Sequence, residues 1–307
     1  MMTKNYLFHR VNPQREKLWD PMDVALFERC IKYISNHYET VLFEELMESG
    51  NLAHGKKYAT IMFDDGFKDN IEYAAPILSK YKCKASFYVV TDCIDQNIPT
   101  WTYNLEYLFQ HTGINTIDLN FDFLPAELKT EKLESNEERI AYVSRLKPQL
   151  KKLSDQQRSE ILERVTATYS DVELPQIMMN WDDLVQLKNE GHYIGSHTVT
   201  HAMLGTIADE KKIMDELVNS GKRIEEKMGY FPVTISYPVG SFNATVKDLA
   251  KTAGYKIGLA VKQNVYDPAK DDLFEISRIE LYNEPWWKTK MRITNVLENL
   301  KSIIRYK

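Results

Sequence analysis

The amino-acid sequence predicts an α/β fold built on parallel strands. Short apolar segments alternate with segments whose apolar residues recur at helical spacing, and this alternation is typical of a parallel sheet. The length of 307 residues is ordinary for a single α/β barrel. Three short motifs also follow directly after predicted strands, which is where α/β barrels place their catalytic groups.

The predicted strands and helices follow one another along most of the chain. Strands are predicted at residues 6–8, 41–43, 58–63, 85–90, 193–194, 233–236, 257–259 and 274–276. Helices are predicted at residues 24–34, 44–47, 74–78, 181–190, 207–228 and 245–252. Gly50, Gly191 and Gly254 end three of these helices, as glycine commonly does.

Residues 104–178 interrupt the alternation. The part from 125 to 164 is rich in Glu, Lys, Arg and Gln, with apolar residues at helical intervals. We interpret residues 104–178 as a mostly helical insertion within one catalytic domain of residues 1–307. Two roles stay open for it, a cap over the active face and a solvated outer layer.

Composition limits the class of protein. Lys and Arg number 39 against 44 Asp and Glu, a net charge of −5, so we expect no nucleic-acid partner. No stretch reaches the roughly 18 apolar residues of a membrane-spanning helix, and the first ten residues do not read as a secretory signal. The three cysteines have no CxxC spacing. We therefore expect a cytoplasmic location.

The first motif is Asp64-Asp65-Gly66, at the end of the predicted strand 58–63. Two adjacent carboxylates at the end of an apolar strand repel each other and are costly to desolvate without a nearby cation or hydrogen-bond donors. Gly66 permits a tight turn. Such triplets are also common in ordinary turns, so this motif is weak by itself.

The second motif places His197 and His201 just after the predicted strand 193–194. Two histidines four residues apart can lie on one side of the chain, and two imidazoles with one carboxylate form a three-ligand site with open positions for water. Zinc, or another divalent ion that accepts nitrogen and oxygen, suits such a site. Each histidine alone is as readily a structural residue, but the two motifs together favour a metal ion.

The third motif is Pro238-Val239-Gly240, which follows the predicted strand 233–236. We interpret it as a tight loop facing the substrate. The backbone N–H of Val239 is a candidate donor to a developing oxyanion.

Together these motifs resemble the polysaccharide deacetylase family, also called carbohydrate esterase family four. Residues 63–66 (Phe-Asp-Asp-Gly) and 197–201 (His-Thr-Val-Thr-His) are similar to its two most diagnostic signatures in type, spacing and order. Trp181, ahead of the segment 191–197, agrees with the same pattern. The resemblance covers most of the chain outside residues 104–178, and it implies a deformed (β/α) barrel with fewer than eight repeats.

The resemblance also implies a function and a role for each residue. The protein would be a metal-dependent hydrolase that removes an N-acyl group, above all acetyl, from a sugar or glycan precursor. Asp64 would be the general base, and Val239 N–H the oxyanion donor. One divalent ion, zinc by preference, would be held by Asp65, His197 and His201.

Two departures from the family pattern lead to further candidates. Ser236 stands where the family has an Arg before the Pro loop, and no histidine follows His201 to act as the acid. The end of the first predicted strand, at His9, looks like the missing acid motif moved to the front, an order similar to the circularly permuted branch that includes poly-N-acetylglucosamine deacetylases. We therefore expect His9 to be the general acid, and Arg278 to replace the missing Arg beside Asp64.

Two further segments are candidates for contacts outside the metal site. Trp101, with Tyr103, can stack on a sugar ring or serve only packing. Residues 286–307 are predicted to form a basic amphipathic helix. Such a helix can lie on an anionic membrane surface, but we expect it to pack on the barrel.

Two other functions remain open at this point. The protein can be a hydrolase of non-peptide C–N bonds in another small substrate, because the metal site does not specify what carries the acyl group. It can also be a carbohydrate-binding relative that has lost turnover. Ser236 and the missing C-terminal acid favour this last reading, whereas intact Asp64 and Asp65 oppose it.

Overall fold

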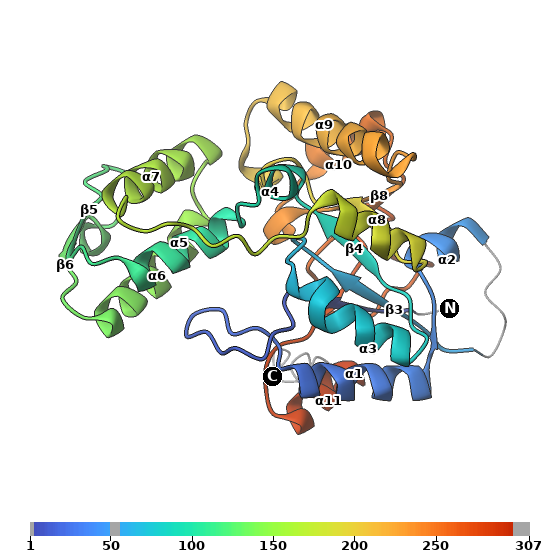
Figure 1. The fold of residues 1–307 in the computed structure, drawn as a ribbon. Helices are drawn as coiled ribbons and strands as arrows, with labels where there is room; N and C mark the ends of the chain where they lie inside the picture. Colours follow the sequence, from blue (N-terminus) through green and yellow to red (C-terminus); the bar gives the residue numbers. More distant parts are fainter. Residues whose placement is uncertain (1–2, 50–55, 297–307) are drawn as a thin grey trace, which may run out of the picture.

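A curled parallel sheet lies at the centre of the computed structural model, which describes residues 3–49 and 56–296 (Figure 1). In spatial order its strands are β10 (Ile279–Glu280), β1 (Lys4–Phe8), β3 (Tyr58–Phe63), β4 (Ser86–Val89), β7 (Tyr193–Ser196), β8 (Thr234–Ser236) and β9 (Ile257–Leu259). An eighth strand, β2 (Glu39–Thr40), pairs with the start of β3. All these pairings are parallel, so the ends of the strands lie along one edge.

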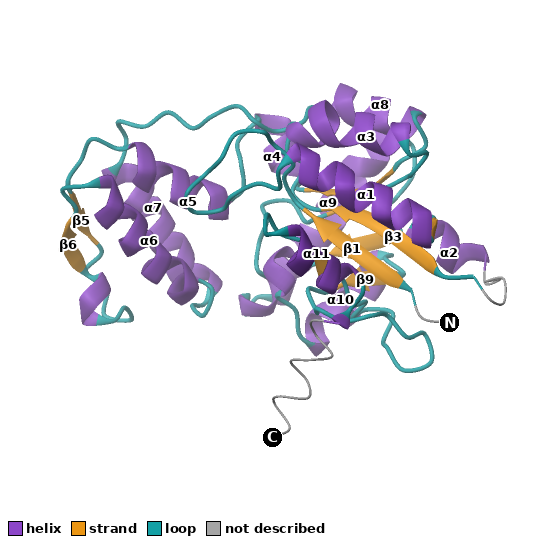
Figure 2. Cartoon of the chain, turned by 90° about the horizontal axis from the view of Figure 1, so that it is seen from below, coloured by secondary structure: helices purple, strands orange, loops and turns teal. Residues whose placement is uncertain are grey.

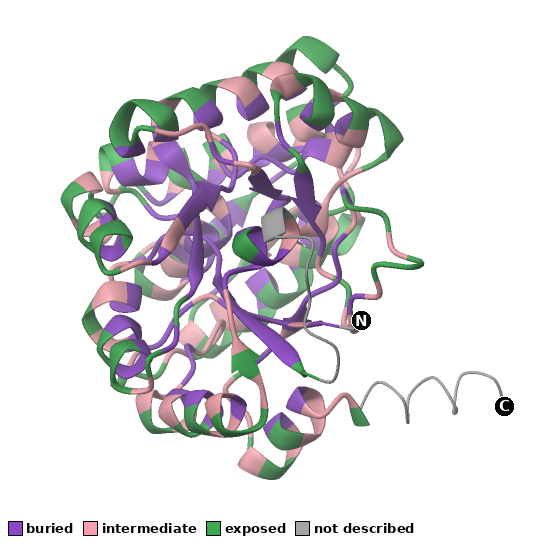
Figure 3. Ribbon diagram, turned by 90° about the vertical axis from the view of Figure 1, so that its right-hand side faces the viewer, coloured by how far each residue is buried: buried purple, intermediate pink, exposed green. Residues whose placement is uncertain are grey.

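Helices cover the outside of this sheet, as Figure 2 shows. They are α1 (Val24–His37), α2 (Phe43–Ser49), α3 (Ala75–Lys80), α4 (Thr91–Gln96), α8 (Trp181–Asn189), α9 (Glu210–Met228), α10 (Ala244–Ala253) and α11 (Trp286–Ile293). The strands are buried, while the helices turn an exposed face outward and a buried face inward (Figure 3). This architecture confirms the α/β fold and the deformed (β/α) barrel.

The segment between β9 and β10 closes much of the barrel. The Ile276 N–H donates a hydrogen bond to Gly258 O of β9 (2.9 Å). The Ile276 carbonyl accepts one from Ala260 N–H, just after β9 (2.9 Å). A few residues later, Leu281 N–H bonds to Leu7 O beside β1 (3.0 Å). The predicted strand at 274–276 is therefore wrong: Ile276 forms only an isolated bridge with Leu259, and the strand itself is β10.

The strand predicted at 41–43 is also wrong. Phe43 begins α2, and the strand β2 lies just before this segment. Phe43, the first residue of the helix, is buried, as is Leu42 just before it. A short apolar run cannot be assigned to strand or helix by periodicity alone, which explains the error.

Between α4 and α8 the chain leaves the barrel and builds a separate layer beside it (Figure 1). This layer, which we call the insertion, contains α5 (Trp101–His111), α6 (Asn136–Leu150), α7 (Asp155–Thr168) and the antiparallel pair β5 (Thr116–Asp118) and β6 (Thr130–Lys132). It has an apolar core of its own, formed by Leu105, Leu108, Phe109, Ile117, Tyr142, Val143, Leu146, Ile161 and neighbouring residues. The insertion is thus a packed unit and not a flexible loop.

The last described helix, α11, packs on α1. Its final residue Ile293 is buried, and the carbonyl of that residue accepts a hydrogen bond from Tyr6 OH at 2.9 Å. The rest of the predicted helix 286–307, beyond residue 296, lies outside the described residues. Within residues 3–49 and 56–296, no helix has both the length and the apolar character needed to span a bilayer.

Glu44 is a buried carboxylate that joins α2 to two strands. It accepts hydrogen bonds from Ser86 Oγ (2.7 Å), Tyr88 OH (2.7 Å) and Thr234 Oγ1 (3.0 Å). Burial raises the pKa of Glu44 above its usual value, and these hydrogen bonds only partly offset that effect. A buried polar group of this kind needs all its partners, so Glu44 fixes how α2 sits on β4 and β8.

The raised pKa of Glu44 makes stability depend on pH. Ionisation is harder in the folded than in the unfolded chain, so the stability that the protonated group contributes is lost as pH rises above 4.5. We expect the free energy of unfolding of Glu44→Gln, relative to that of the wild type, to be higher at about pH 7 than at about pH 4. Urea unfolding at the two pH values measures this difference. Glu45→Gln, at the exposed neighbouring position, is the control. If the variant and the wild type differ in free energy of unfolding by the same amount at both pH values, Glu44 does not cause the pH dependence.

Candidate active site

The three sequence motifs meet at one cavity of about 260 Å³, at the edge where the parallel strands end. Its wall combines residues from the barrel and from the insertion: His9, Trp19, Asp64, Asp65, Thr102, Lys147, Lys151, His197, His201, Val239, Val261 and Glu280. The carboxyl ends of β1, β3, β7 and β8 supply its polar floor. A parallel sheet brings together side chains that lie far apart in the sequence.

Asp65, His197 and His201 are fully buried and converge on one point. Asp65 Oδ1 lies 3.4 Å from His197 Nε2 and 3.3 Å from His201 Nε2. Two ligand atoms of a tetrahedral zinc ion, each about 2.0–2.1 Å from it, are about 3.4 Å apart, so these separations fit a shared ion. Among the described residues this is the only group of His, Cys, Asp and Glu side chains close enough to hold a metal ion.

The surroundings of these three side chains also fit a metal ion. Asp65 Oδ1 is buried without a hydrogen-bond partner, an arrangement that is costly unless a cation satisfies it. Ser236 O lies 2.8 Å from His197 Nδ1, which places the proton on Nδ1 and leaves Nε2 free to bind. Although burial opposes ionisation, the two imidazoles hold the pKa of Asp65 well below its usual value. Burial lowers the pKa of His201, which keeps it neutral as a ligand must be.

Asp64 accepts its side-chain hydrogen bonds from an arginine and a serine, and His197 Nε2 lies 4.0 Å from its Oδ2. Arg278 Nη1 donates to Asp64 Oδ1 at 2.8 Å, and Ser236 Oγ donates to Asp64 Oδ2 at 3.1 Å. Arg278 Nη2 in turn donates to Ser236 Oγ at 3.0 Å. Burial would raise the pKa of Asp64, but the Arg278 guanidinium and His197 hold it below its usual value. The carboxylate is therefore ionised and fixed in direction.

The backbone of the site is strained. Among the described residues, seven non-glycine residues have a positive φ, and four of them are in the motifs: Asp65 (76°), Thr198 (68°), His201 (62°) and Val239 (57°). Left-handed conformations of this kind cost on the order of 1–3 kcal/mol each and persist only where the surroundings enforce them. Gly66, at φ 91°, takes the conformation that glycine adopts without that cost.

Glu216 of α9 enforces the conformation of the histidine loop. This buried carboxylate accepts hydrogen bonds from Val199 N–H (2.8 Å), Thr200 N–H (3.0 Å) and Thr200 Oγ1 (2.7 Å). These donors lie between His197 and His201. Glu216 therefore sets the relative position of the two imidazoles without touching either of them.

His9 follows β1 and lines the same cavity as Asp64. Its Nδ1 lies 3.5 Å from Glu280 Oε1, and its ring makes a T-shaped contact with the Trp19 ring, with the centroids 5.1 Å apart. The partly exposed imidazole is thus oriented by a carboxylate on one side and an indole on the other. Because β1 lies between β10 and β3, the first strand of the chain ends beside the last.

Two candidate substrate-binding residues lie elsewhere. Trp101 is not on the cavity wall: its Nε1 donates to His201 O at 3.2 Å, and the Arg158 guanidinium lies 5.7 Å over its ring. Pro238 is buried beneath the loop, whereas Val239 lines the cavity. The aromatic residue on the wall is Trp19.

Several wall residues were not identified from the sequence. Trp19 belongs to an irregular loop, Lys147 belongs to the charged helix α6, and Lys151 follows that helix directly, so their side chains carried no local signal. Glu280 has a weak signal, because it stands two residues after the predicted Arg278 and at the end of β10. The position of each in space depends on packing between distant segments.

Comparison with known proteins identifies the family. The polysaccharide deacetylase profile matches residues 51–258, which is more than half of the chain. The chain belongs to the polysaccharide deacetylase family. Over 71 residues it is 39% identical to a peptidoglycan-N-acetylglucosamine deacetylase of Bacillus cereus, a match that covers 23% of this chain and 32% of that protein. The chain thus spans about a third of the length of this curated relative.

Solved structures of similar fold span nearly the whole chain. The deacetylase PplD of Streptococcus pyogenes, in complex with acetate, superposes with a TM-score of 0.62 at 17% identity and covers 92% of this chain and 94% of its own. IcaB from Ammonifex degensii gives a TM-score of 0.62 at 14% identity, covering 95% and 97%. At these identities the likeness establishes the shared fold of this polysaccharide deacetylase.

The contacts of Glu216 predict that it controls metal affinity. We expect Glu216→Gln to weaken binding of a divalent ion by roughly tenfold, because the histidine loop loses its charged acceptor. Titration of the metal-free protein with zinc, followed by calorimetry, measures the effect. Glu225→Gln, at an exposed position on the same helix, is the matched control. Equal affinity in the wild type and Glu216→Gln would show that the loop holds its conformation without this carboxylate.

Proposed function

We propose that the protein hydrolyses an N-acyl group, acetyl by preference, from a sugar or glycan precursor. The observation that carries this proposal is that Asp64, the ligand set of Asp65 and two histidines, and His9 all line one cavity. Amide hydrolysis requires a base, a metal site and a proton donor, and here all three line the same cavity. Membership of the polysaccharide deacetylase family supports the sugar substrate.

We further propose that Asp65, His197 and His201 hold one divalent ion, with zinc preferred for two nitrogen ligands and one oxygen ligand. A bound ion of this kind supplies a Lewis acid that polarises a carbonyl and makes nearby water more acidic. Three protein ligands leave a coordination position open for substrate or water, as catalytic sites do.

The protein groups then divide the proton transfers between them. Asp64, ionised and aimed by Arg278 and Ser236, takes the proton of the attacking water. The Val239 N–H is the proposed donor to the oxyanion that forms on the acyl carbon. His9, oriented by Glu280, protonates the leaving amine, which otherwise departs as a very poor anion.

Release of amine tests the function directly. We expect the protein to free amines from a panel of N-acetylated sugars, and we expect a chelator to abolish this activity and added zinc to restore it. A carbohydrate-binding protein without turnover would release no amine from any member of the panel. A hydrolase of other C–N bonds would leave the sugars intact and act on small non-sugar amides.

The Asp64→Asn variant separates the base from the metal ligands. We expect turnover to fall by roughly two to four orders of magnitude, because the amide cannot accept the proton of water. Metal content should match the wild type, because Asp65 and not Asp64 completes the ligand set. If Asp64→Asn loses the metal ion, then Asp64 is the metal ligand and the roles assigned to the two aspartates are reversed.

The His9→Ala variant tests the acid. Turnover of an N-acetyl sugar should fall by roughly two to four orders of magnitude. An activated ester, whose leaving group needs no proton, should be hydrolysed nearly as fast as by the wild type. His37→Ala, at the exposed end of α1, is the control. Equal losses on amide and ester would assign His9 a structural role.

A further inference from the structure

The insertion places two lysines in the wall of the catalytic cavity. Lys147 and Lys151 lie one turn apart, at the end of α6 and just beyond it. Both line the same cavity as Asp64 and His197, although they come from a unit with its own apolar core. The reaction proposed above uses neither of them.

The charges around the cavity leave one of these lysines without a partner. Asp64 pairs with Arg278, and Glu280 pairs with His9 and accepts a hydrogen bond from Tyr282 OH at 2.5 Å. Asp65 faces the two histidines of the proposed metal site. The Lys151 ammonium makes no ion pair or side-chain hydrogen bond with any residue in 3–49 or 56–296. Glu280 and Glu106 act on this cation only at longer range, and neither carboxylate contacts it.

Lys147 is held in place and keeps donors to spare. Its Nζ contacts Glu106 Oε1 of α5 at 2.6 Å and lies 5.9 Å over the ring of Trp19. An ammonium has three N–H donors, so the bond to Glu106 leaves others that can meet a ligand. Glu106 is itself buried, which fixes Lys147 against α5.

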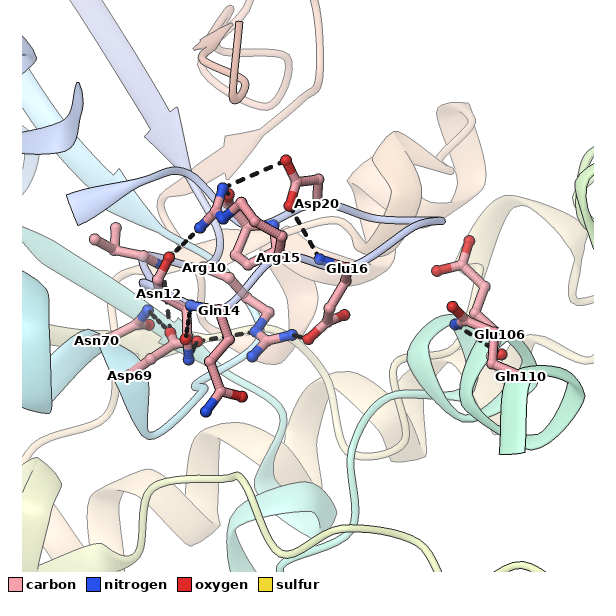
Figure 4. Close-up of polar contacts among 12 residues, drawn as sticks. Arg10, Asn12, Gln14, Arg15, Glu16, Asp20, Asp69, Asn70, Glu106 and Gln110 are labelled. Atoms are coloured by element: carbon pink, nitrogen blue, oxygen red, sulfur yellow. Dashed lines mark hydrogen bonds and ion pairs between the residues drawn. The ribbon is translucent and has the colours of Figure 1, made fainter. Parts of the chain in front are cut away.

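Trp19 completes this side of the cavity and is held by a well-anchored loop. The loop leaves and rejoins the barrel through a bridge between Val11 and Met22. At its base, buried Arg10 donates to Asp69 Oδ2 (2.9 Å) and pairs with Glu16, as Figure 4 shows. The indole is therefore a fixed surface in the same cavity wall as the two lysines, suited to the apolar face of a sugar ring.

We propose that Trp19, Lys147 and Lys151 form a subsite for an anionic group, phosphate or carboxylate, carried by the substrate beside the N-acylated sugar. This inference rests on the proposed deacetylase function and narrows its substrate to an acidic sugar or glycan. A neutral sugar would leave Lys151 without a direct ionic partner, whereas an anion gains from both ammonium groups in a partly enclosed cavity.

A second role for the lysines would be purely structural. Cations near the end of a helix interact favourably with its macrodipole. The Lys147 ammonium, however, reaches Glu106 on a neighbouring helix and not a carbonyl of its own helix end. A structural role predicts loss of stability without any change in substrate preference, so the two roles can be separated by measurement.

The first experiment compares matched substrates. Amine release is measured on the methyl glycoside of N-acetylglucosamine, on N-acetylglucosamine 1-phosphate and on a disaccharide of N-acetylglucosamine with a uronic acid. We expect kcat/KM at low salt to be about tenfold higher for at least one charged substrate, and this preference to shrink as ionic strength rises. Comparison of the last two substrates distinguishes phosphate from carboxylate. Equal kcat/KM for all three overturns the proposal.

The second experiment assigns the preference to the subsite. Lys151→Gln should bring the ratio of charged to neutral kcat/KM close to one, and Lys151→Arg should keep it. Lys152→Gln is the matched control, because Lys152 is an exposed neighbour outside the cavity wall. A Lys151→Gln variant that lowers kcat/KM equally on charged and neutral substrates overturns the proposal and indicates a structural role.

A binding measurement tests the anionic subsite independently of the deacetylase function. The sugar phosphate and the neutral glycoside are titrated into the wild type and Lys151→Gln with chelator present, so that phosphate has no metal ion to bind. Tighter binding of the phosphate that depends on Lys151 supports the subsite even if no amine is released. Absence of amine release contradicts the deacetylase function, and equal binding of the two sugars contradicts the anionic subsite.

Discussion

The guanidinium of Arg278 joins the ends of the strands on which the active site is built. It is fully buried and donates to Asp64 Oδ1 after β3, to Ser236 Oγ of β8 and to Ala260 O after β9. A buried charge is tolerated only when its donors are satisfied, so these strand ends must stay together. The same contacts keep Asp64 ionised and aimed. Closure of the barrel and orientation of the proposed base thus depend on one side chain.

This arrangement shows why the order of groups along the chain matters less than the order of strands in the sheet. The family pattern has an Arg where this chain has Ser236, and here the guanidinium arrives from the segment before β10, with the serine hydroxyl as a bridge. His9 likewise reaches the cavity from the first strand, because β1 lies between β10 and β3. In a curled parallel sheet, side chains at the ends of neighbouring strands can face the same cavity, whatever the order of those strands in the sequence.

The left-handed residues carry a cost that the surrounding hydrogen bonds offset. The loop between the two histidines takes positive φ at Thr198 and His201 while Glu216 accepts its N–H groups and Trp101 donates to the His201 carbonyl. Because these hydrogen bonds fix the strained loop, the two imidazoles are already in one arrangement before an ion binds. Binding of the ion then requires less rearrangement of the loop. The insertion takes part in this support through Trp101, so it contributes to both the metal site and the cavity wall.

The sequence by itself determined the α/β fold and the two motifs at Asp64-Asp65 and His197/His201, because both depend on local order: a buried strand, then polar residues at its end. Short segments at 41–43 and 274–276 were assigned wrongly, because a few apolar residues fit a helix turn, a bridge or a strand equally well. Only the tertiary structure decided that Trp19 and not Trp101 faces the cavity, and that Lys147 and Lys151 reach it from the insertion. Those positions result from packing between segments that lie far apart in the sequence, such as those of Trp19 and Lys147, which no local pattern records.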